Sequence, residues 1–321
     1  MKNESQILAI RDLRVRYNSE RGPVTAVDGV SFSIMQGEVF GLAGESGCGK
    51  STIAQTILRV LRPPAVITGG SIEFRDRQVL EMTDEELASF RWREVSLVFQ
   101  SAMNSLNPLI TIGDQILDVI QAHTDRNKRD ARERAAEMLK RVGIEPDRLR
   151  SYPHELSGGM RQRAVIAMAL SLEPTLAIMD EPTTALDVLV QRQILEEIEE
   201  LRTSIGFSIL FITHDLSLLV GFSQRIAIMY AGQIVEMSYS SELVREPFHP
   251  YTLGLLDSFP SVNGERRKLI GIPGTPPDMS APPGGCRFHP RCAKAMERCR
   301  FVAPQLRELK PDHWVACHLY D

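Results

Sequence analysis

Long hydrophobic runs are scarce in this chain of 321 residues. The apolar stretches, such as SILFIT, are far shorter than the roughly 18 residues that a membrane-spanning helix needs. The N-terminus is polar and charged before any apolar residue, whereas a secretory signal places a basic flank before an apolar core. We therefore expect a cytosolic protein that does not itself cross a membrane.

A strong charge of one sign is also missing. The net charge is −4 and the isoelectric point is about 6.0. No global basic bias favours nucleic acid, and we expect no nucleic-acid partner. The 43% hydrophobic and 24% charged residues are typical of a globular protein. The length allows one large domain and a small one, with a substantial core that needs no crosslinks.

Cysteine is scarce except near the C-terminus. Only Cys48 lies outside the tail, where Cys286, Cys292, Cys299 and Cys317 follow the spacing C-x5-C-x6-C-x17-C. A reducing cytosol disfavours disulfides, so clustered cysteines there more often bind metal or do redox chemistry. The spacing lacks the CxxC pairs of common zinc ribbons. A metal site, free thiols and a disulfide all remain open on this evidence.

Strand and helix patterns alternate along most of the chain. Alternating apolar and polar residues predict strands within positions 5 to 40 and in SIEFRDRQVL and EVSLVFQ. After GESGCGKST the apolar residues follow a helical period, which predicts a helix that ends at Arg62. Thr83 is expected to cap a short helix, and residues 108–155 are predicted to be mainly helical. The buried strands TLAIMDE and SILFIT, each followed by a helical pattern, predict a largely parallel α/β sheet. Proline becomes dense after about residue 245, which marks a domain boundary, and YTLGLLDSF is predicted to pack as a helix.

The stretch GESGCGKST matches the phosphate-binding pattern GxxxxGKS/T between a predicted strand and a predicted helix. Its backbone N–H groups and the helix N-terminus suit phosphate oxygens. Lys50 is expected to reach the β- and γ-phosphates, and Ser51 to ligate Mg²⁺. Cys48 is expected to be a small filler rather than a nucleophile. The candidate nucleotide-binding residues are Gly44, Glu45, Ser46, Gly47, Cys48, Gly49, Lys50, Ser51 and Thr52.

Two further motifs fit nucleotide chemistry. The strand TLAIMDE ends in Asp180, expected to hold Mg²⁺, and Glu181, expected to orient and deprotonate the attacking water. In LSGGMRQR, Ser157, Gly158 and Gly159 begin a helix and so predict a second anion site. Taken alone, that stretch is also explained by an N-cap serine followed by flexible glycines.

The motifs GESGCGKST, LSGGMRQR, LAIMDEP, TALD and FITHD, in this order, resemble an ATP-binding cassette (ABC) ATPase. The resemblance implies an α/β P-loop NTPase: a RecA-like core with antiparallel strands at its start and a helical subdomain at about 101–160. In that family two cassettes meet head to tail, so that each ATP lies between two chains. The resemblance also implies that Gln100 senses Mg²⁺ and the attacking water and that His214 contacts the γ-phosphate. It makes Asp187 a cross-interface residue and Tyr17 the aromatic that stacks on adenine.

The closer resemblance is to the oligopeptide/dipeptide branch of ABC importers. It is carried by MNSLNP, YPHELSGGMRQR, MYAGQIVE, HPYTLGLL and the four-cysteine tail. It implies an ATPase domain at 1–245, a small Cys-rich extension at 246–321 and an iron–sulfur cluster, typically [4Fe–4S], on the four cysteines, with zinc as the alternative. The implied partners are a second ABC ATPase subunit, two transmembrane permease subunits and, indirectly, an extracytoplasmic substrate-binding protein.

The resemblance therefore implies a peripheral ATPase subunit on the cytoplasmic face of the membrane, docked near Gln100. Its expected function is ATP hydrolysis that powers import of di- or oligopeptides. Many peptide-type members follow the glutamine with Asp-Pro, whereas this chain has Ser101-Ala102, as in relatives that import β-linked oligosaccharides. Oligosaccharide import is thus the alternative, and a soluble non-transport ABC ATPase with a metal-bearing interaction tail is the more distant one.

Overall fold

The computed structural model describes residues 5–20, 22–99, 105–184, 186–258 and 271–321. The chain divides into two compact units. Unit 1 comprises Met1–Ser5, Met35–Glu38 and Glu81–Leu210, and unit 2 comprises Gln6–Ile34, Val39–Leu80 and Phe211–Asp321. Gln100, Ser101 and Ala102 lie outside the described residues. No helix among the described residues is both long and apolar enough to cross a bilayer.

Unit 2 begins with an antiparallel sheet, as the alternating residues near the N-terminus predict. Its strands follow the order β2-β1-β4-β5. The predicted strand SIEFRDRQVL is divided, because Arg75 has a positive φ of 50° and turns the chain between β4 and β5. The bounds are β1 Gln6–Ser19, β2 Gly22–Met35, β4 Ala65–Phe74 and β5 Arg77–Gln78, followed by the 3₁₀ turn η1 Val79–Glu81.

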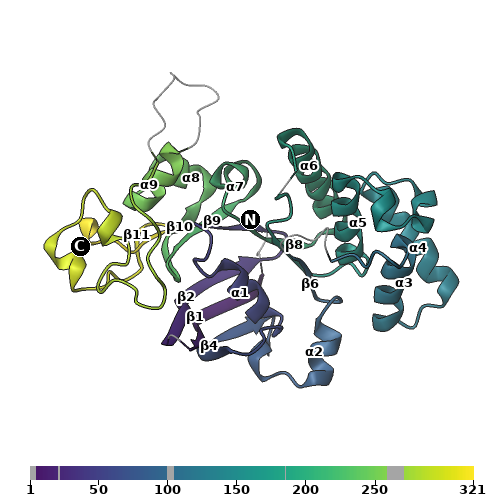
Figure 1. Ribbon diagram of the computed structural model, residues 1–321, viewed down its shortest axis with the longest axis horizontal. Coiled ribbons are helices and arrows are strands. Elements are labelled where there is room, and N and C mark those ends of the chain that lie inside the picture. Colours follow the sequence, from purple (N-terminus) through teal and green to yellow (C-terminus); the bar gives the residue numbers. More distant parts are fainter. Residues whose placement is uncertain (1–4, 21, 100–104, 185, 259–270) are drawn as a thin grey trace. The chain divides into compact units, whose positions relative to one another are not determined.

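A second sheet of unit 2 contains the core strand β3, and Figure 1 shows the C-terminal strand β11 at the β10 side of this sheet. Within this unit the order is β11-β12-β10-β9-β3, with β3 parallel to β9 and the remaining pairs antiparallel. The C-terminal segment thus adds two strands to the sheet that carries β3. The bounds are β3 Val39–Ala43, β9 Arg225–Tyr230, β10 Gln233–Tyr239, β11 Arg307–Lys310 and β12 His313–Val315.

The helices of unit 2 include α1, which is shorter than predicted. It ends at Ile57 rather than near Arg62, because Arg59 adopts a left-handed φ of 50° and the N–H of Val60 bonds to the carbonyl of Gln55. Because glycine usually occupies such a position, an arginine there does not signal the end of a helix. The predicted helix at YTLGLLDSF is confirmed as α9. The bounds are α1 Lys50–Ile57, α7 Leu216–Phe222, α8 Ser240–Arg245, α9 Pro250–Asp257, η5 His289–Arg291, η6 Glu297–Arg300 and η7 His318–Tyr320.

Unit 1 is mainly helical, which confirms the prediction for residues 108–155 where they are described. Helices α3, α4 and α5 pack on one another, and β6 and β7 pair in parallel. The strand β8, Ser208–Thr213, spans the division between the units. The other bounds are α2 Asp84–Phe90, β6 Val95–Val98, α3 Ile112–His123, α4 Lys128–Arg141, η3 Pro146–Arg150, η4 Pro153–Glu155, α5 Gly158–Leu170, β7 Leu176–Asp180 and α6 Val188–Ile205.

Side-chain caps explain where the helices of unit 1 begin. In each helix from α2 to α6, an Asn, Asp, Ser or Thr accepts a hydrogen bond from a backbone N–H of the first turn. The predicted cap Thr83 is confirmed and forms a reciprocal capping box with Glu86. The other caps are Thr111, Asn127, Ser157 and Asp187.

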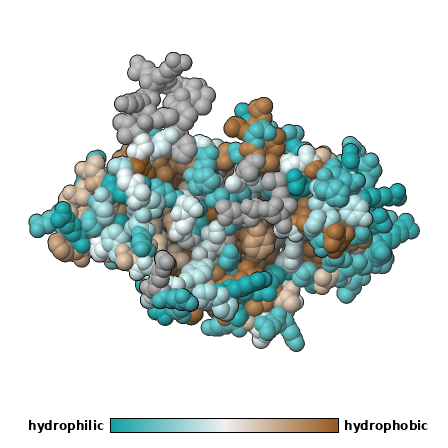
Figure 2. All heavy atoms as spheres, in the orientation of Figure 1, coloured by the Kyte–Doolittle hydropathy of each residue, from teal (hydrophilic) through white to brown (hydrophobic). Residues whose placement is uncertain are grey.

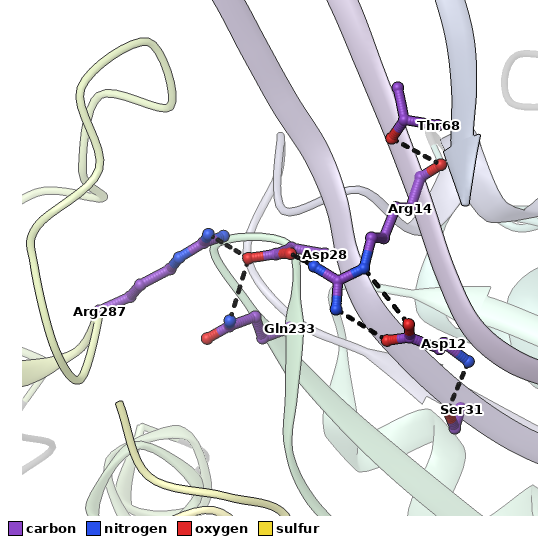
Figure 3. A network of polar contacts seen from close by, with 7 residues as sticks. All are labelled: Asp12, Arg14, Asp28, Ser31, Thr68, Gln233 and Arg287. Carbon is purple, nitrogen blue, oxygen red and sulfur yellow. Dashed lines mark hydrogen bonds and ion pairs between the residues drawn. The ribbon is translucent and has the colours of Figure 1, made fainter. Parts of the chain in front are cut away.

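Polar contacts join the C-terminal segment to the rest of unit 2. Figure 3 shows Asp28 on β2 between two arginines: Arg14 of β1 at 2.8 Å and Arg287 of the C-terminal segment at 2.5 Å. Glu236 of β10 is fully buried, and its Oε1 lies 2.8 Å from Nε2 of His313 on β12. The segment is therefore part of the packed structure of unit 2.

Candidate nucleotide-binding site and cysteine cluster

The phosphate-binding loop joins β3 to α1 within unit 2. Its conformation requires glycine at two places where another main chain comes close. A Cβ atom on Gly44 would lie 2.2 Å from the carbonyl oxygen of Met229, and one on Gly49 would lie 2.2 Å from that of Ala26. Both glycines also have positive φ, 151° and 106°. The sequence pattern thus folds into the tight loop that phosphate binding needs.

Lys50 is buried at the end of this loop, with only 5% of its surface exposed. Its Nζ donates hydrogen bonds to the carbonyl oxygens of Gly44 at 2.7 Å and Glu45 at 3.0 Å, and lies 3.7 Å from the sulfur of Cys48. Among the residues that the structure describes, no carboxylate pairs with it. A buried charge held by neutral groups alone is costly, so the site favours an incoming anion.

Other predicted residues of unit 2 lie on neighbouring elements. The hydroxyl of Tyr17 on β1 is 3.3 Å from Oγ1 of Thr52 on α1, so this tyrosine lies beside the helix that follows the loop. His214 is exposed directly after β8. Cys48 is buried, and burial raises the pKa of its thiol even though Lys50 opposes the shift. A protonated, buried thiol fits the predicted role of a filler.

The predicted carboxylates lie in unit 1, where β7 ends. Asp180 is the last residue of that strand and is 5% exposed. Glu181 follows with a positive φ of 50°, a conformation that a non-glycine residue rarely adopts. Its Oε2 accepts a hydrogen bond from Oγ1 of Thr184 at 3.0 Å. Such a backbone outlier at the carboxyl end of a strand is typical of functional positions.

The LSGG and TALD motifs meet in unit 1. Ser157 is the N-cap of α5 and accepts from the N–H of Met160 at 3.3 Å, so the N-cap interpretation is confirmed. A Cβ atom on Gly159 would lie 3.0 Å from the side chain of Val190, whose N–H is capped by Asp187 of TALD. The two motifs therefore share one packed corner.

Beside this corner, α6 presents an exposed apolar pair. Val188 and Leu189 are 77% and 80% exposed. Figure 2 shows a hydrophobic patch where the start of α6 lies in Figure 1. The position is next to Asp187, the residue for which the family resemblance implies a role between two cassettes.

The predicted site residues thus form two groups. Lys50, Ser51, Tyr17 and His214 belong to unit 2, while Asp180, Glu181, Ser157 and Asp187 belong to unit 1. Gln100 is outside the described residues.

One contact of the loop has no counterpart in the sequence motifs. The two terminal guanidinium nitrogens of Arg291, Nη1 and Nη2, lie within 2.9 Å of the carboxylate of Glu45. The two residues are 246 positions apart, and no local pattern connects them.

The four tail cysteines are all free thiols and lie close together. Burial raises the pKa of Cys286 to about 11, and charge on the other three cysteines adds to this shift. The sulfur of Cys299 accepts a hydrogen bond from the backbone N–H of Met296 at 3.4 Å. The backbone at Phe288, Lys294 and Leu319 lowers the pKa of Cys286, Cys292 and Cys317, respectively, against the larger effect of burial.

A backbone N–H donor of this kind suits a bound thiolate. However, in the described part of the chain no three His, Cys, Asp or Glu side chains converge as one metal ion would require. The structure therefore does not show the predicted metal site.

The tail histidines have other partners. His289 Nδ1 is 2.9 Å from the carbonyl oxygen of Cys286, and His313 binds Glu236. His318 lies between Asp321 at 2.6 Å and the carbonyl oxygen of Val302 at 2.8 Å. The four cysteines remain the candidate ligands.

Solved structures with a similar fold define the class of protein. The ATP-binding cassette MJ0796, solved as a dimer in a post-hydrolysis state with ADP and Pi, matches with a TM-score of 0.65 and 28% identity, over 73% of this chain and 99% of that chain. CbiO1 of Clostridium perfringens, part of an ABC transporter complex, matches with a TM-score of 0.66 and 27% identity, over 76% of this chain and 92% of that chain. The fold is an ABC cassette.

Sequence comparisons narrow the class to a family. The ABC transporter family matches residues 27–184, and the family described as "Oligopeptide/dipeptide transporter, C-terminal region" matches residues 235–299. The dipeptide transport ATP-binding protein DppD of Bacillus subtilis (strain 168) is 43% identical over 98% of this chain and 95% of its own length. The oligopeptide transport ATP-binding protein OppD of Escherichia coli (strain K12) is 42% identical over 97% and 92%. The chain belongs to the ATP-binding subunits of the oligopeptide/dipeptide family of ABC transporters, which hydrolyse ATP to power transport.

Proposed function

We propose that this subunit powers the import of di- and oligopeptides through a membrane complex. The names of the similar relatives, which are dipeptide and oligopeptide transport proteins, support peptide as the cargo and do not favour oligosaccharide. The proposed complex contains a second ABC ATPase subunit, two permease subunits and an extracytoplasmic binding protein. The chain lies peripherally on the cytoplasmic face of the membrane.

One observation carries the motor role: the ammonium of Lys50 is buried, and among the described residues its contacts are two main-chain carbonyls and a thiol. ATP phosphates supply the negative charge that this group lacks. Backbone N–H groups of the loop and of the start of α1 are the proposed phosphate donors, and Tyr17 on β1 is the proposed adenine platform. The loop from Gly44 to Thr52 is therefore the proposed nucleotide site.

Residues of both groups have proposed roles in ATP hydrolysis. Mg²⁺ stabilises charge on the phosphates, and Ser51, Asp180 and Gln100 are its proposed ligands. Both described ligands offer oxygen atoms, the donor type that this ion prefers. Glu181 is the proposed base for the attacking water, and His214 the proposed contact to the γ-phosphate.

We also propose that two cassettes close on ATP. The loop of one chain and the α5 start at Ser157 of the other hold the nucleotide, and hydrolysis removes this bridge. The exposed Val188 and Leu189 beside Asp187 provide an apolar surface for the second cassette. Within each chain, the proposed ATPase domain comprises residues 1–245 and includes the helical subdomain at about 101–160. The proposed extension comprises residues 246–321.

Purification from membranes tests the assembly, and uptake tests the cargo. We expect the tagged chain, extracted with detergent from its own cells, to bring down two multi-spanning proteins and a cassette. In proteoliposomes with the binding protein, that complex should accumulate labelled di- or oligopeptide only when ATP is supplied. If the membranes contain the permeases but the tagged chain is recovered only from the soluble fraction, the proposed assembly is contradicted. Uptake of oligosaccharide but not of peptide would contradict the cargo.

The four tail cysteines are proposed to hold a [4Fe–4S] cluster. The number of thiols, their proximity and the N–H that Met296 donates to the sulfur of Cys299 fit such a group. A cluster would add a stable crosslink between parts of the extension.

We expect anaerobically purified protein to contain about four iron and four sulfide per chain, as four-thiolate ligation implies. Cys299→Ser should lose most of both and the visible absorption, while Cys48→Ser keeps them. Zinc without sulfide in the wild-type protein would overturn the cluster and favour the zinc alternative.

A further inference from the structure

The C-terminal extension contacts the phosphate-binding loop directly at Glu45. The guanidinium of Arg291 makes two contacts with that carboxylate, 2.7 Å from Nη1 to Oε2 and 2.9 Å from Nη2 to Oε1. The backbone N–H of Glu45 donates to the hydroxyl of Tyr251 on α9 at 3.0 Å. Residues of the extension therefore hold both the carboxylate and the backbone N–H of Glu45.

Arg291 is fixed more firmly than an ordinary surface arginine. Its side chain is 6% exposed, its Nε donates to the carbonyl oxygen of Pro273 at 2.9 Å, and its guanidinium lies 5.7 Å from the ring centre of Tyr230. A bidentate pair with a buried, stacked guanidinium has defined geometry, unlike exposed ion pairs. The side chain thus sets where Glu45 can lie.

The extension and the loop also line one cavity together. A cavity of about 120 Å³ is bounded by Pro276, Pro277 and Met279 of the extension and by loop residues Glu45 to Cys48. The loop contains Gly44, Gly47 and Gly49, and glycine loses more conformational freedom on ordering than any other residue. Contacts that restrict the loop before ATP arrives reduce the entropy lost on binding.

Charge gives the pair a second effect. Glu45 places a carboxylate in a loop that is to receive the negative phosphates of ATP, and Arg291 neutralises it at hydrogen-bond distance. Without Arg291 the same carboxylate would repel the nucleotide. Both effects act through Glu45 and neither requires Arg291 to touch ATP.

We propose that Arg291 is a positioning residue for the nucleotide site: the C-terminal extension sets ATP affinity by holding and neutralising Glu45. The inference rests on the proposed role of the loop in binding ATP. The 3₁₀ turn that carries Arg291, η5, lies between Cys286 and Cys292. The cysteine cluster and the phosphate-binding loop are therefore linked through one short segment.

The test is titration of full-length protein with Mg–ATP by calorimetry, together with the ATP dependence of hydrolysis by the complex. We expect Arg291→Met to raise Kd and KM about tenfold, the effect of losing roughly one charge-assisted pair, with kcat changed less than twofold. Arg291→Lys should recover part of the affinity because it keeps the charge. The double variant Glu45→Gln with Arg291→Met should bind ATP more tightly than Arg291→Met alone, because it no longer carries the unneutralised carboxylate.

Arg287→Met is the matched control, because Arg287 also anchors the extension to a carboxylate but uses Asp28 of β2. It should leave Kd for ATP unchanged. Equal weakening by Arg287→Met, wild-type binding by Arg291→Met, or additive losses in the double variant would overturn the proposal. If Arg291→Met does not fold, Glu45→Gln and Arg291→Lys still test the proposal. An affinity for ATP equal to that of the wild type in both variants would count against the proposal. Unchanged ATP binding in Lys50→Met would instead refute the nucleotide site itself.

Discussion

Glu181→Gln should abolish nearly all ATP turnover and leave ATP binding intact. Loss of general-base catalysis lowers rates by about 10²- to 10⁴-fold, and the amide of glutamine cannot accept the proton of the attacking water. The substitution is nearly isosteric, and a glutamine oxygen can still accept the hydrogen bond from Thr184. The backbone at φ 50° is equally accessible to both residues. We therefore expect the chemical step to change without a change in folding.

Single-turnover and steady-state hydrolysis, with ATP binding measured on the same preparation, check this result. Glu196→Gln is a suitable control, since it removes an exposed carboxylate of unit 1 that pairs with Arg192 on α6. It should hydrolyse ATP normally. Steady-state turnover by Glu181→Gln close to that of the wild type would refute the assignment of the base. A parallel loss of ATP binding would show that Glu181 holds the nucleotide instead.

The local parts of the fold and site could be predicted from sequence because their signals are local. The loop at Gly44–Thr52 has a fixed spacing between a strand and a helix, and Thr83 carries the spacing of a capping box. Ser157 is likewise predictable as an N-cap, because it bonds to an N–H only three residues away. In each case the interacting groups are a few residues apart, so periodicity and spacing identify them.

Long-range contacts and unusual backbone turns could not be predicted in this way. The end of α1 depends on a left-handed arginine, Arg59, where the usual signal is glycine. The pairing of β10 with β12 and the contact of Arg291 with Glu45 join residues far apart in the chain. The spacing of the four cysteines can be recognised in the sequence, whereas the contact that Arg291, on η5 between Cys286 and Cys292, makes with the loop cannot.

Replacement of Lys50 by methionine should separate binding from stability. We expect Lys50→Met to bind ATP about 10- to 100-fold more weakly, since hydrogen bonds to charged groups contribute roughly 1.5–3 kcal/mol. Turnover should fall as well, because Lys50 is proposed to contact the β- and γ-phosphates. Without nucleotide the variant should be at least as stable as the wild type. Methionine has a similar length, and it removes an ammonium that is buried against two main-chain carbonyls and a thiol.

Melting curves with and without Mg–ATP measure both effects. Wild-type protein should be stabilised by about 2.7 kcal/mol when ATP is at 100 times Kd, and the variant by much less at the same concentration. Lys310→Met, which removes an exposed ion pair with Glu246 in the extension, should lose a little stability and keep the full ATP shift. A structural lysine would give the opposite pattern, with a lower melting temperature and an unchanged shift. Stability gained where function is lost is the expected signature of a charge that the fold tolerates only for its ligand.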